Sequence, residues 1–154
     1  MRLRLFCALA MVAGLAGCDS GPTLPSGVVR AVLSVAVDPN PVPGRPSTTL
    51  GFSTISYKVV IKEMAGLGGE FVFLNATVFD ETSGRSVGVN NFDGADLIVF
   101  VGSKRLEAGQ STEISQQIDY GLPQDSTGAR LVVSVQFRDD RGNVLNQSLL
   151  VKVE

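Results

Sequence analysis

The residues of this 154-residue chain best suited to chemistry are carboxylates that gather in three pairs between apolar runs. The pairs are Asp80 with Glu81, Asp93 with Asp96, and Asp139 with Asp140. Carboxylate oxygens bind calcium, which takes about six to eight oxygen ligands, and two opposed carboxyl groups hydrolyse glycosidic bonds. Aspartate is also a common turn residue, and no pair has the spacing of a known calcium loop. We therefore predict no cofactor and no metal, and name Asp93 and Asp96 as the ligand candidates for any calcium site.

Residue types on which many active sites depend are absent. The chain has no histidine, which excludes a Ser-His-Asp triad, a Cys-His pair and a zinc ion held by imidazole. A formal net charge of −2 gives no cluster of cations for phosphate contacts, so we predict no nucleic-acid partner. An enzyme that depends on carboxylates remains an alternative, but we predict that the protein is not an enzyme.

The N-terminal segment has the pattern of an export signal. Arg2 and Arg4 precede an apolar run from Leu5 to Ala16, which is shorter than the roughly 20 residues of a membrane-spanning helix. Small residues follow, and the sequence Leu15-Ala16-Gly17-Cys18 ends in a cysteine. This segment resembles the bacterial lipoprotein signal and its lipobox. The resemblance implies that residues 1–17 are cleaved off and that Cys18 carries a thioether-linked diacylglycerol together with a further acyl chain such as palmitate.

The same resemblance implies a location in the bacterial cell envelope. The protein would be anchored to a membrane by its lipid and would face the periplasm or the exterior. In enteric bacteria an aspartate after the lipidated cysteine retains such proteins at the inner membrane, and Asp19 occupies that position. Residues 18–27 contain two prolines and read as a short flexible tether. Loss of Cys7 with the signal, and lipidation of Cys18, would leave no thiol for a disulfide.

From residue 28 to residue 154 the pattern is that of β-structure. Apolar residues alternate with polar ones in short runs that are separated by Gly, Pro, Asn and Asp. The predicted strands are 29–37, 57–64, 71–80, 85–89, 97–101, 112–120, 131–138 and 144–153, with no helix. Residues 139–143 favour a hairpin between the last two strands. Short strands with turns between them are typical of a sandwich or a barrel.

We predict a single all-β domain, an immunoglobulin-like β-sandwich of about seven or eight antiparallel strands. The proline-broken first strand and the terminal hairpin are similar to bacterial immunoglobulin-like or fibronectin type III-like modules. The chain departs from antibody domains because it has no tryptophan and lacks the core cysteine pair.

The predicted strand 71–80 is apolar on both faces. Phe71, Phe73 and Phe79 fall on one face by alternation, and Val72, Leu74, Ala76 and Val78 fall on the other. One interpretation is a central strand whose outer face is covered by a loop such as segment 38–54. The alternative is an exposed partner-binding surface formed by the three phenylalanines.

These features predict a membrane-anchored envelope lipoprotein that acts as a non-catalytic binding or structural module. Its partner would be another envelope protein or a polysaccharide. Two alternatives stay open, a small carboxylate-dependent envelope enzyme and a calcium-stabilised adhesion module.

Overall fold

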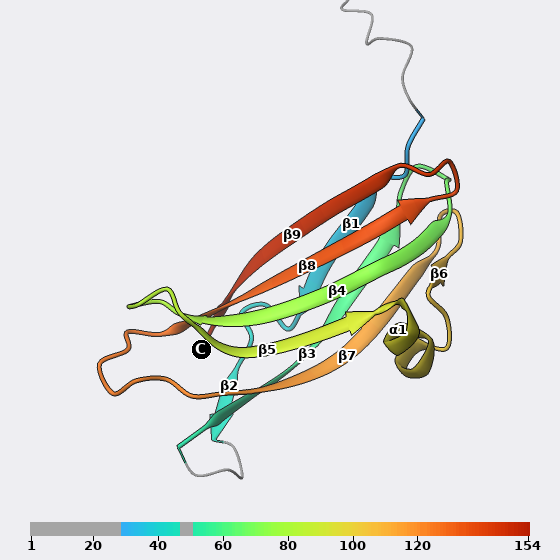
Figure 1. Ribbon diagram of the computed structural model, residues 1–154. Coiled ribbons are helices and arrows are strands. Elements are labelled where there is room, and N and C mark those ends of the chain that lie inside the picture. Colours follow the sequence, from blue (N-terminus) through green and yellow to red (C-terminus); the bar gives the residue numbers. More distant parts are fainter. Residues whose placement is uncertain (1–28, 47–50) are drawn as a thin grey trace, which may run out of the picture.

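The computed structural model describes residues 29–46 and 51–154 (Figure 1). The predicted signal peptide 1–17, Cys18, Asp19 and the rest of the tether to residue 27 lie outside the described residues. In the part of the chain that the structure describes, no helix is long and apolar enough to cross a membrane.

The protein folds into two antiparallel sheets that pack face to face. The four-stranded sheet contains β1 (Leu33–Asp38), β2 (Gly44–Pro46), β3 (Ser53–Glu63) and β7 (Ser111–Tyr120). In it β3 is central and pairs with β7 along one edge and with β1 and β2 along the other. The five-stranded sheet contains β4 (Gly69–Asp80), β5 (Ser86–Asp93), β6 (Arg105–Leu106), β8 (Ala129–Asp139) and β9 (Val144–Val153). The order of its long strands is β5-β4-β8-β9, and β6 pairs with the start of β4. The predicted all-β sandwich is confirmed.

The distribution of strands between the sheets is immunoglobulin-like. In that fold strands A, B and E share one sheet and strands C, F and G share the other. Here β1, β3 and β7 occupy the first set of positions, β4, β8 and β9 occupy the second, and β5 is added beside β4. The chain passes from one sheet to the other after β3, before β7 and again before β8 (Figure 1).

The core lies between the sheets and is built from alternate residues of the long strands, as the period of two requires. The alternation predicted for 57–64, 112–120 and 131–138 is confirmed, and so is the hairpin, in which Arg138 pairs with Val144. Side chains with no exposed surface at all include Ile55, Val59, Ile61, Leu74, Val78, Leu131, Val133 and Phe137.

One predicted strand is a helix. Residues 97–101 belong to α1 (Gly94–Val101), which lies at one end of the sandwich beside β7 (Figure 1). Residues 90–96, which lie between two of the predicted strands, are the end of β5 and the first turn of this helix. Asp93 is the N-cap, and Gly102 ends the helix in the left-handed conformation with φ 81°, which glycine adopts without steric cost. Leu97 is fully buried and Val101 packs against the core, so these apolar side chains dock the helix onto the sandwich.

The segment expected to cover the outer face of β4 lies elsewhere. The backbone N–H of Val42 donates to the carbonyl of Lys152 at 3.0 Å, and Gly44–Pro46 pair with β3. The described part of segment 38–54 therefore closes the edge between the two sheets. The interpretation that this segment covers the outer face of β4 is wrong for the residues that the structure describes.

Two buried carboxylates fasten the chain that leads into β1. The Glu63 side chain accepts hydrogen bonds from the backbone N–H groups of Val32, Ala65, Gly66, Leu67 and Gly109. The Asp139 side chain accepts from the backbone N–H groups of Ala31, Arg141 and Asn143. Burial alone would raise the pKa of each carboxyl, but these donors outweigh it and hold both pKa values below their usual range.

Candidate functional site

A β-bulge at Val72 divides the three phenylalanines between the two faces of β4. Phe71 lies opposite Phe137 of β8, whereas Phe73 lies opposite Gln136, the next residue along that strand. Because β4 carries one extra residue here, its alternation shifts by one position. The expectation that Phe71, Phe73 and Phe79 share a face is therefore wrong for Phe71.

Each phenylalanine has a different environment. Phe71 is only 4% exposed, and its ring meets that of Phe137 edge to face at a centroid distance of 5.3 Å. Phe79 is half-buried on the outer face, where the Arg130 guanidinium lies 5.8 Å from its ring centroid. Phe73 is 37% exposed. Of the three, Phe73 is the most exposed, so it is the one best suited to contact a partner.

Two rows of side chains cross the outer face of the five-stranded sheet at Phe73 and Asn75. Register partners place Asp93, Phe73, Gln136 and Asn146 in the first row. They place Asn91, Asn75, Ser134 and Ser148 in the second. We call the six uncharged polar members the polar ladder: Asn75, Asn91, Ser134, Gln136, Asn146 and Ser148. Apart from Asp93, the two rows carry no charge.

Hydrogen bonds between neighbouring strands hold the polar ladder in place. The Asn75 amide donates to the Asn91 side-chain oxygen, and the Gln136 amide donates to the Asn146 side-chain oxygen at 2.9 Å. The hydroxyls of Ser134 and Ser148 lie 2.9 Å apart. Cross-strand pairs of this kind stabilise a sheet and also fix the orientation of the side chains.

A shallow depression of about 480 Å³ lies beside Phe73, between β4 and β5. Its lining residues are Phe73, Leu74, Asn75, Asn91, Phe92, Asp93 and Ser134. One aromatic ring and several amide or hydroxyl groups therefore converge on one open hollow. Polar groups placed around an apolar surface are typical of ligand sites.

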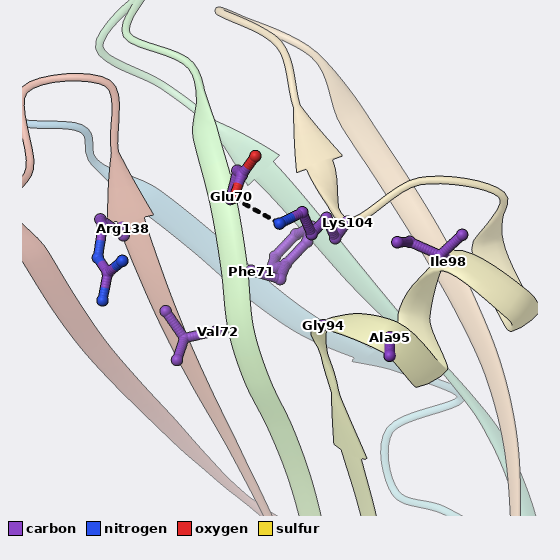
Figure 2. A pocket seen from close by; sticks show the side chains of 8 residues that line it. All are labelled: Glu70, Phe71, Val72, Gly94, Ala95, Ile98, Lys104 and Arg138. Carbon is purple, nitrogen blue, oxygen red and sulfur yellow. Dashed lines mark ion pairs between the residues drawn. The ribbon is translucent and has the colours of Figure 1, made fainter.

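A second depression, of about 350 Å³, lies on the other side of the bulge (Figure 2). Ala95 and Ile98 project toward it from α1, and Arg138 comes from β8. The Lys104 ammonium lies 2.9 Å from the Glu70 carboxylate, and both side chains are more than 40% exposed. Exposed ion pairs contribute little stability. This depression is charged, in contrast to the one beside Phe73.

The outer face of the other sheet has a different composition. Lys58 and Lys62 of β3 and Glu113 of β7 lie on it, and Lys58 forms an ion pair with Glu113 at 3.1 Å. Charged residues are usual on a sheet face that only meets water. The two rows at Phe73 and Asn75, in which Asp93 is the one charged residue, therefore differ from this charged surface.

The carboxylates singled out in the sequence cap turns and the helix. The Asp93 side chain accepts from the backbone N–H groups of Ala95 and Asp96, and the Asp96 side chain accepts from the N–H of Asp93 at 3.1 Å. Together they form the capping box of α1. Across residues 29–46 and 51–154 no three potential ligands form a group that could hold a metal ion.

In each of the other two acidic pairs, unlike Asp93 and Asp96, the two members lie in different environments. Asp80 accepts hydrogen bonds from the hydroxyls of Ser126 and Ser83, which lower its pKa to about 2 against the opposing effect of burial. Its neighbour Glu81 is exposed. Asp139 is buried, as described above, whereas Asp140 binds the Arg105 guanidinium through both oxygens at 2.7 and 2.9 Å. Adjacent carboxylates in the sequence, Asp80 with Glu81 and Asp139 with Asp140, thus lie in different environments.

Comparison with known proteins places the chain by fold only. No family model and no curated protein matches the sequence. The ApaA protein of Bordetella pertussis has a similar structure, with a TM-score of 0.57 and 13% identity over 82% of this chain and 98% of that one. A structural genomics target solved by X-ray crystallography has a TM-score of 0.56 and 10% identity over 79% and 86% of the two chains. A weaker likeness, with a TM-score of 0.42 and 15% identity, links 82% of this chain to 96% of a CARDB domain from Pyrococcus furiosus. At identities of 10–13%, the first two likenesses show a shared fold alone.

Proposed function

We propose that the protein is a membrane-anchored, non-catalytic binding module of the bacterial cell envelope. It presents the outer face of its five-stranded sheet to another envelope component, a protein or a polysaccharide. The observation that carries this proposal is the exposed ring of Phe73 in a depression whose other lining groups are almost all uncharged. Exposed aromatic side chains in such positions are typical anchors of binding interfaces.

The chemistry of the depression favours binding over catalysis. Glycoside hydrolysis needs two carboxyl groups on either side of the bond that breaks. Among the residues that line the depression, Asp93 is the sole carboxylate, and its Oδ1 already accepts hydrogen bonds from two backbone N–H groups in the first turn of α1. Glu63, Asp80 and Asp139 are buried and bound to loops away from this face. The carboxylates therefore serve the structure.

The proposed membrane anchor rests on the resemblance of residues 1–18 to the bacterial lipoprotein signal. Two acyl chains hold a protein stably at a membrane, whereas one holds it only marginally. If residues 19–27 act as the tether that the sequence predicts, its root-mean-square reach would be roughly 15–18 Å. The domain would then work close to the membrane surface and turn freely. We expect Cys18→Ala to block lipid-dependent processing and to prevent normal anchoring at the membrane, which the mature N-terminus and cell fractionation would report.

Site-specific photocrosslinking in intact cells tests the binding surface. The full chain carries a photoreactive phenylalanine analogue at position 73, and a matched chain carries it at position 52, where Phe52 is 46% exposed on another part of the surface. We expect a discrete adduct from position 73 and none from position 52. Equal yields from the two positions, or no adduct at position 73, would contradict the proposal. Cys18→Ala combined with the label at position 73 should lower the yield, because the protein would leave the membrane.

A further inference from the structure

We propose that the ligand of this face is an uncharged polysaccharide, which lies across β5, β4, β8 and β9 along the polar ladder with one sugar ring on Phe73. This inference rests on the proposed function, because it names the partner of the same surface. It is argued from the donors and acceptors that the ladder leaves available, from the ring of Phe73 and from the charge of the rows.

The polar ladder retains hydrogen-bonding groups after its cross-strand bonds are made. An amide side chain has a carbonyl oxygen and an NH2 group, and each bond described above uses only one of them. Asn91 and Asn146 accept through oxygen and keep their NH2 groups, while Gln136 donates through nitrogen and keeps its oxygen. Within the described chain these three groups make no other hydrogen bond. A ligand with many hydroxyls, which both donate and accept, suits such a mixed set.

The ladder is also held in a binding orientation before any ligand arrives. Asn75 is fixed on both sides, since its amide donates to Asn91 and its oxygen accepts from the Thr77 hydroxyl at 3.0 Å. Side chains that are already ordered lose little further entropy on binding. Since neighbouring strands lie about 4.8 Å apart, a four-strand row spans roughly 14 Å, which accommodates a short run of linked sugars.

Phe73 supplies the apolar part of the site. The faces of a pyranose ring carry C–H groups, and these cover an exposed aromatic ring without leaving polar groups unpaired. Gln136 and Asn146 follow Phe73 in the same row, so a sugar on the ring would meet amide groups beside it. One ring flanked by amides fits a carbohydrate better than a protein partner, whose interface centres on clustered aromatic and arginine side chains.

The charge of the surface favours a neutral polymer. The two rows contain no cation, and their one carboxylate, Asp93, would repel an acidic chain. Charged side chains lie in other rows, with Glu70 and Arg138 directly beyond one side of the ladder. On the other side an apolar row that includes Val89, Val132 and Leu150 comes first, and Arg130 and Lys152 lie beyond it. A peptide that adds a strand would use the backbone at a sheet edge, whereas the ladder offers side chains on a face.

Binding to defined polysaccharides tests the inference. The probes are hydroxyethylcellulose, dextran and galactomannan, which are neutral, and polygalacturonate, which is acidic. The full-length protein in detergent is run by affinity electrophoresis through gels that contain each polymer, at low and high salt. We expect retardation by at least one neutral polymer, unchanged by salt, and none by polygalacturonate.

Substitutions locate the site. Phe73→Ser should weaken retardation at least tenfold, and Asn91→Ala and Asn146→Ala should each weaken it several-fold. The matched controls are Phe52→Ser, another exposed phenylalanine, and Gln117→Ala, an exposed amide on the outer face of the four-stranded sheet, and both should bind as the unmodified protein does. Far-ultraviolet circular dichroism checks that each variant is folded. If Phe73→Ser is unfolded, the binding of Asn91→Ala and Asn146→Ala decides the test.

Three results would overturn the inference: no retardation by any neutral polymer, salt-sensitive retardation by polygalacturonate alone, or equal losses in the ladder variants and the controls. Crosslinking separates this failure from failure of the proposed function. If position 73 yields a protein adduct in cells while no neutral polymer binds, the binding face stands and the polysaccharide is wrong. If position 73 yields no adduct and no polymer binds, both proposals fail.

Discussion

The bulge at Val72 predicts that two phenylalanines only two positions apart contribute very differently to stability. Phe71→Ala removes a ring that is 4% exposed and that packs edge to face on Phe137. Truncation of a buried phenylalanine costs about 3–5 kcal/mol, which includes the cavity that remains. The edge-to-face contact accounts for about 0.5–1.5 kcal/mol of such a loss. For a domain of this size that loss corresponds to a fall of about 10–25 °C in the thermal midpoint.

Phe73→Ser should cost much less. The ring is 37% exposed, so about two-thirds of its surface is covered. Full burial of a phenylalanine side chain contributes about 1.5–3 kcal/mol, and the covered fraction therefore contributes about 1–2 kcal/mol. No closed cavity forms, because the position opens to solvent. The free energy of unfolding should fall at least twice as far in Phe71→Ala as in Phe73→Ser.

Urea unfolding followed by far-ultraviolet circular dichroism measures both values. All variants are compared in the unlipidated Cys18→Ala background, and Phe52→Ser serves as a control at a third, 46% exposed position. Without the bulge, alternation would place Phe71 and Phe73 on the same face, and their substitutions would cost similar amounts. Equal losses, or a larger loss for Phe73→Ser, would refute the assignment of Phe71 to the core.

Three further predictions concern the buried carboxylates and one close backbone contact. Glu63→Gln should lower the free energy of unfolding by about 2–4 kcal/mol, because the amide NH2 of glutamine would face backbone N–H donors. The control Glu113→Gln, which removes one partner of an exposed ion pair, should change it by less than about 1 kcal/mol, and similar urea midpoints for the two variants would contradict the prediction. The free energy of unfolding should be constant from pH 7 to about pH 4 and fall toward pH 2. The pKa of Asp80 is about 2 in the folded state and 3.8 in the unfolded state, so acid protonates the unfolded chain first and favours it. Urea unfolding at several pH values measures this profile, and a flat profile would contradict the prediction. Gly69→Ala should lower the free energy of unfolding by about 3 kcal/mol or more, because the new Cβ would lie 2.3 Å from the carbonyl oxygen of Arg138. In the same urea assay the control Gly94→Ala, where the nearest atom to a new Cβ is 3.4 Å away, should be nearly neutral.

The strands that sequence reasoning predicted well are those that bury one face. In residues 131–138 every second side chain is buried in the core, so the alternation of the sequence predicts which residues are inside. The short strands β2 and β6 carry no such pattern, because their places depend on pairing with β3 and β4, which are distant in sequence. Local residue types cannot specify a partner that lies elsewhere in the chain.

The helix was missed because a short apolar run fits a buried strand and a buried helix equally well. Residues 97–101 are apolar throughout, so they carry no period of two and no period of 3.6. A signal was nevertheless present at the ends. Asp93 and Asp96 have the spacing of a capping box, and Gly102 follows the apolar run as a helix-ending glycine does.

The candidate site could be predicted in part. Strand 71–80 was singled out because it is apolar on both faces, and Phe73 does lie at an open surface. The shift of phase was not readable, because Phe71, Phe73 and Phe79 all alternate with Leu74, Ala76 and Val78 in the sequence, and only the pairing with β8 reveals the bulge. The polar ladder was not readable, because Asn91, Gln136 and Asn146 come together only through the register of four strands.

The two carboxylates that hold the chain ahead of β1 also decide how the domain bears mechanical load. A pull directed along the N-terminal segment reaches Ala31, which is bound to Asp139 of the five-stranded sheet, and Val32, which is bound to Glu63 of the four-stranded sheet. The tension is therefore divided between both layers before it reaches β1. Beyond that point it shears β1 against β3, with six register pairs loaded at once, instead of peeling them apart in turn. A module tethered at this end would resist being pulled apart while the outer face of its five-stranded sheet holds a partner.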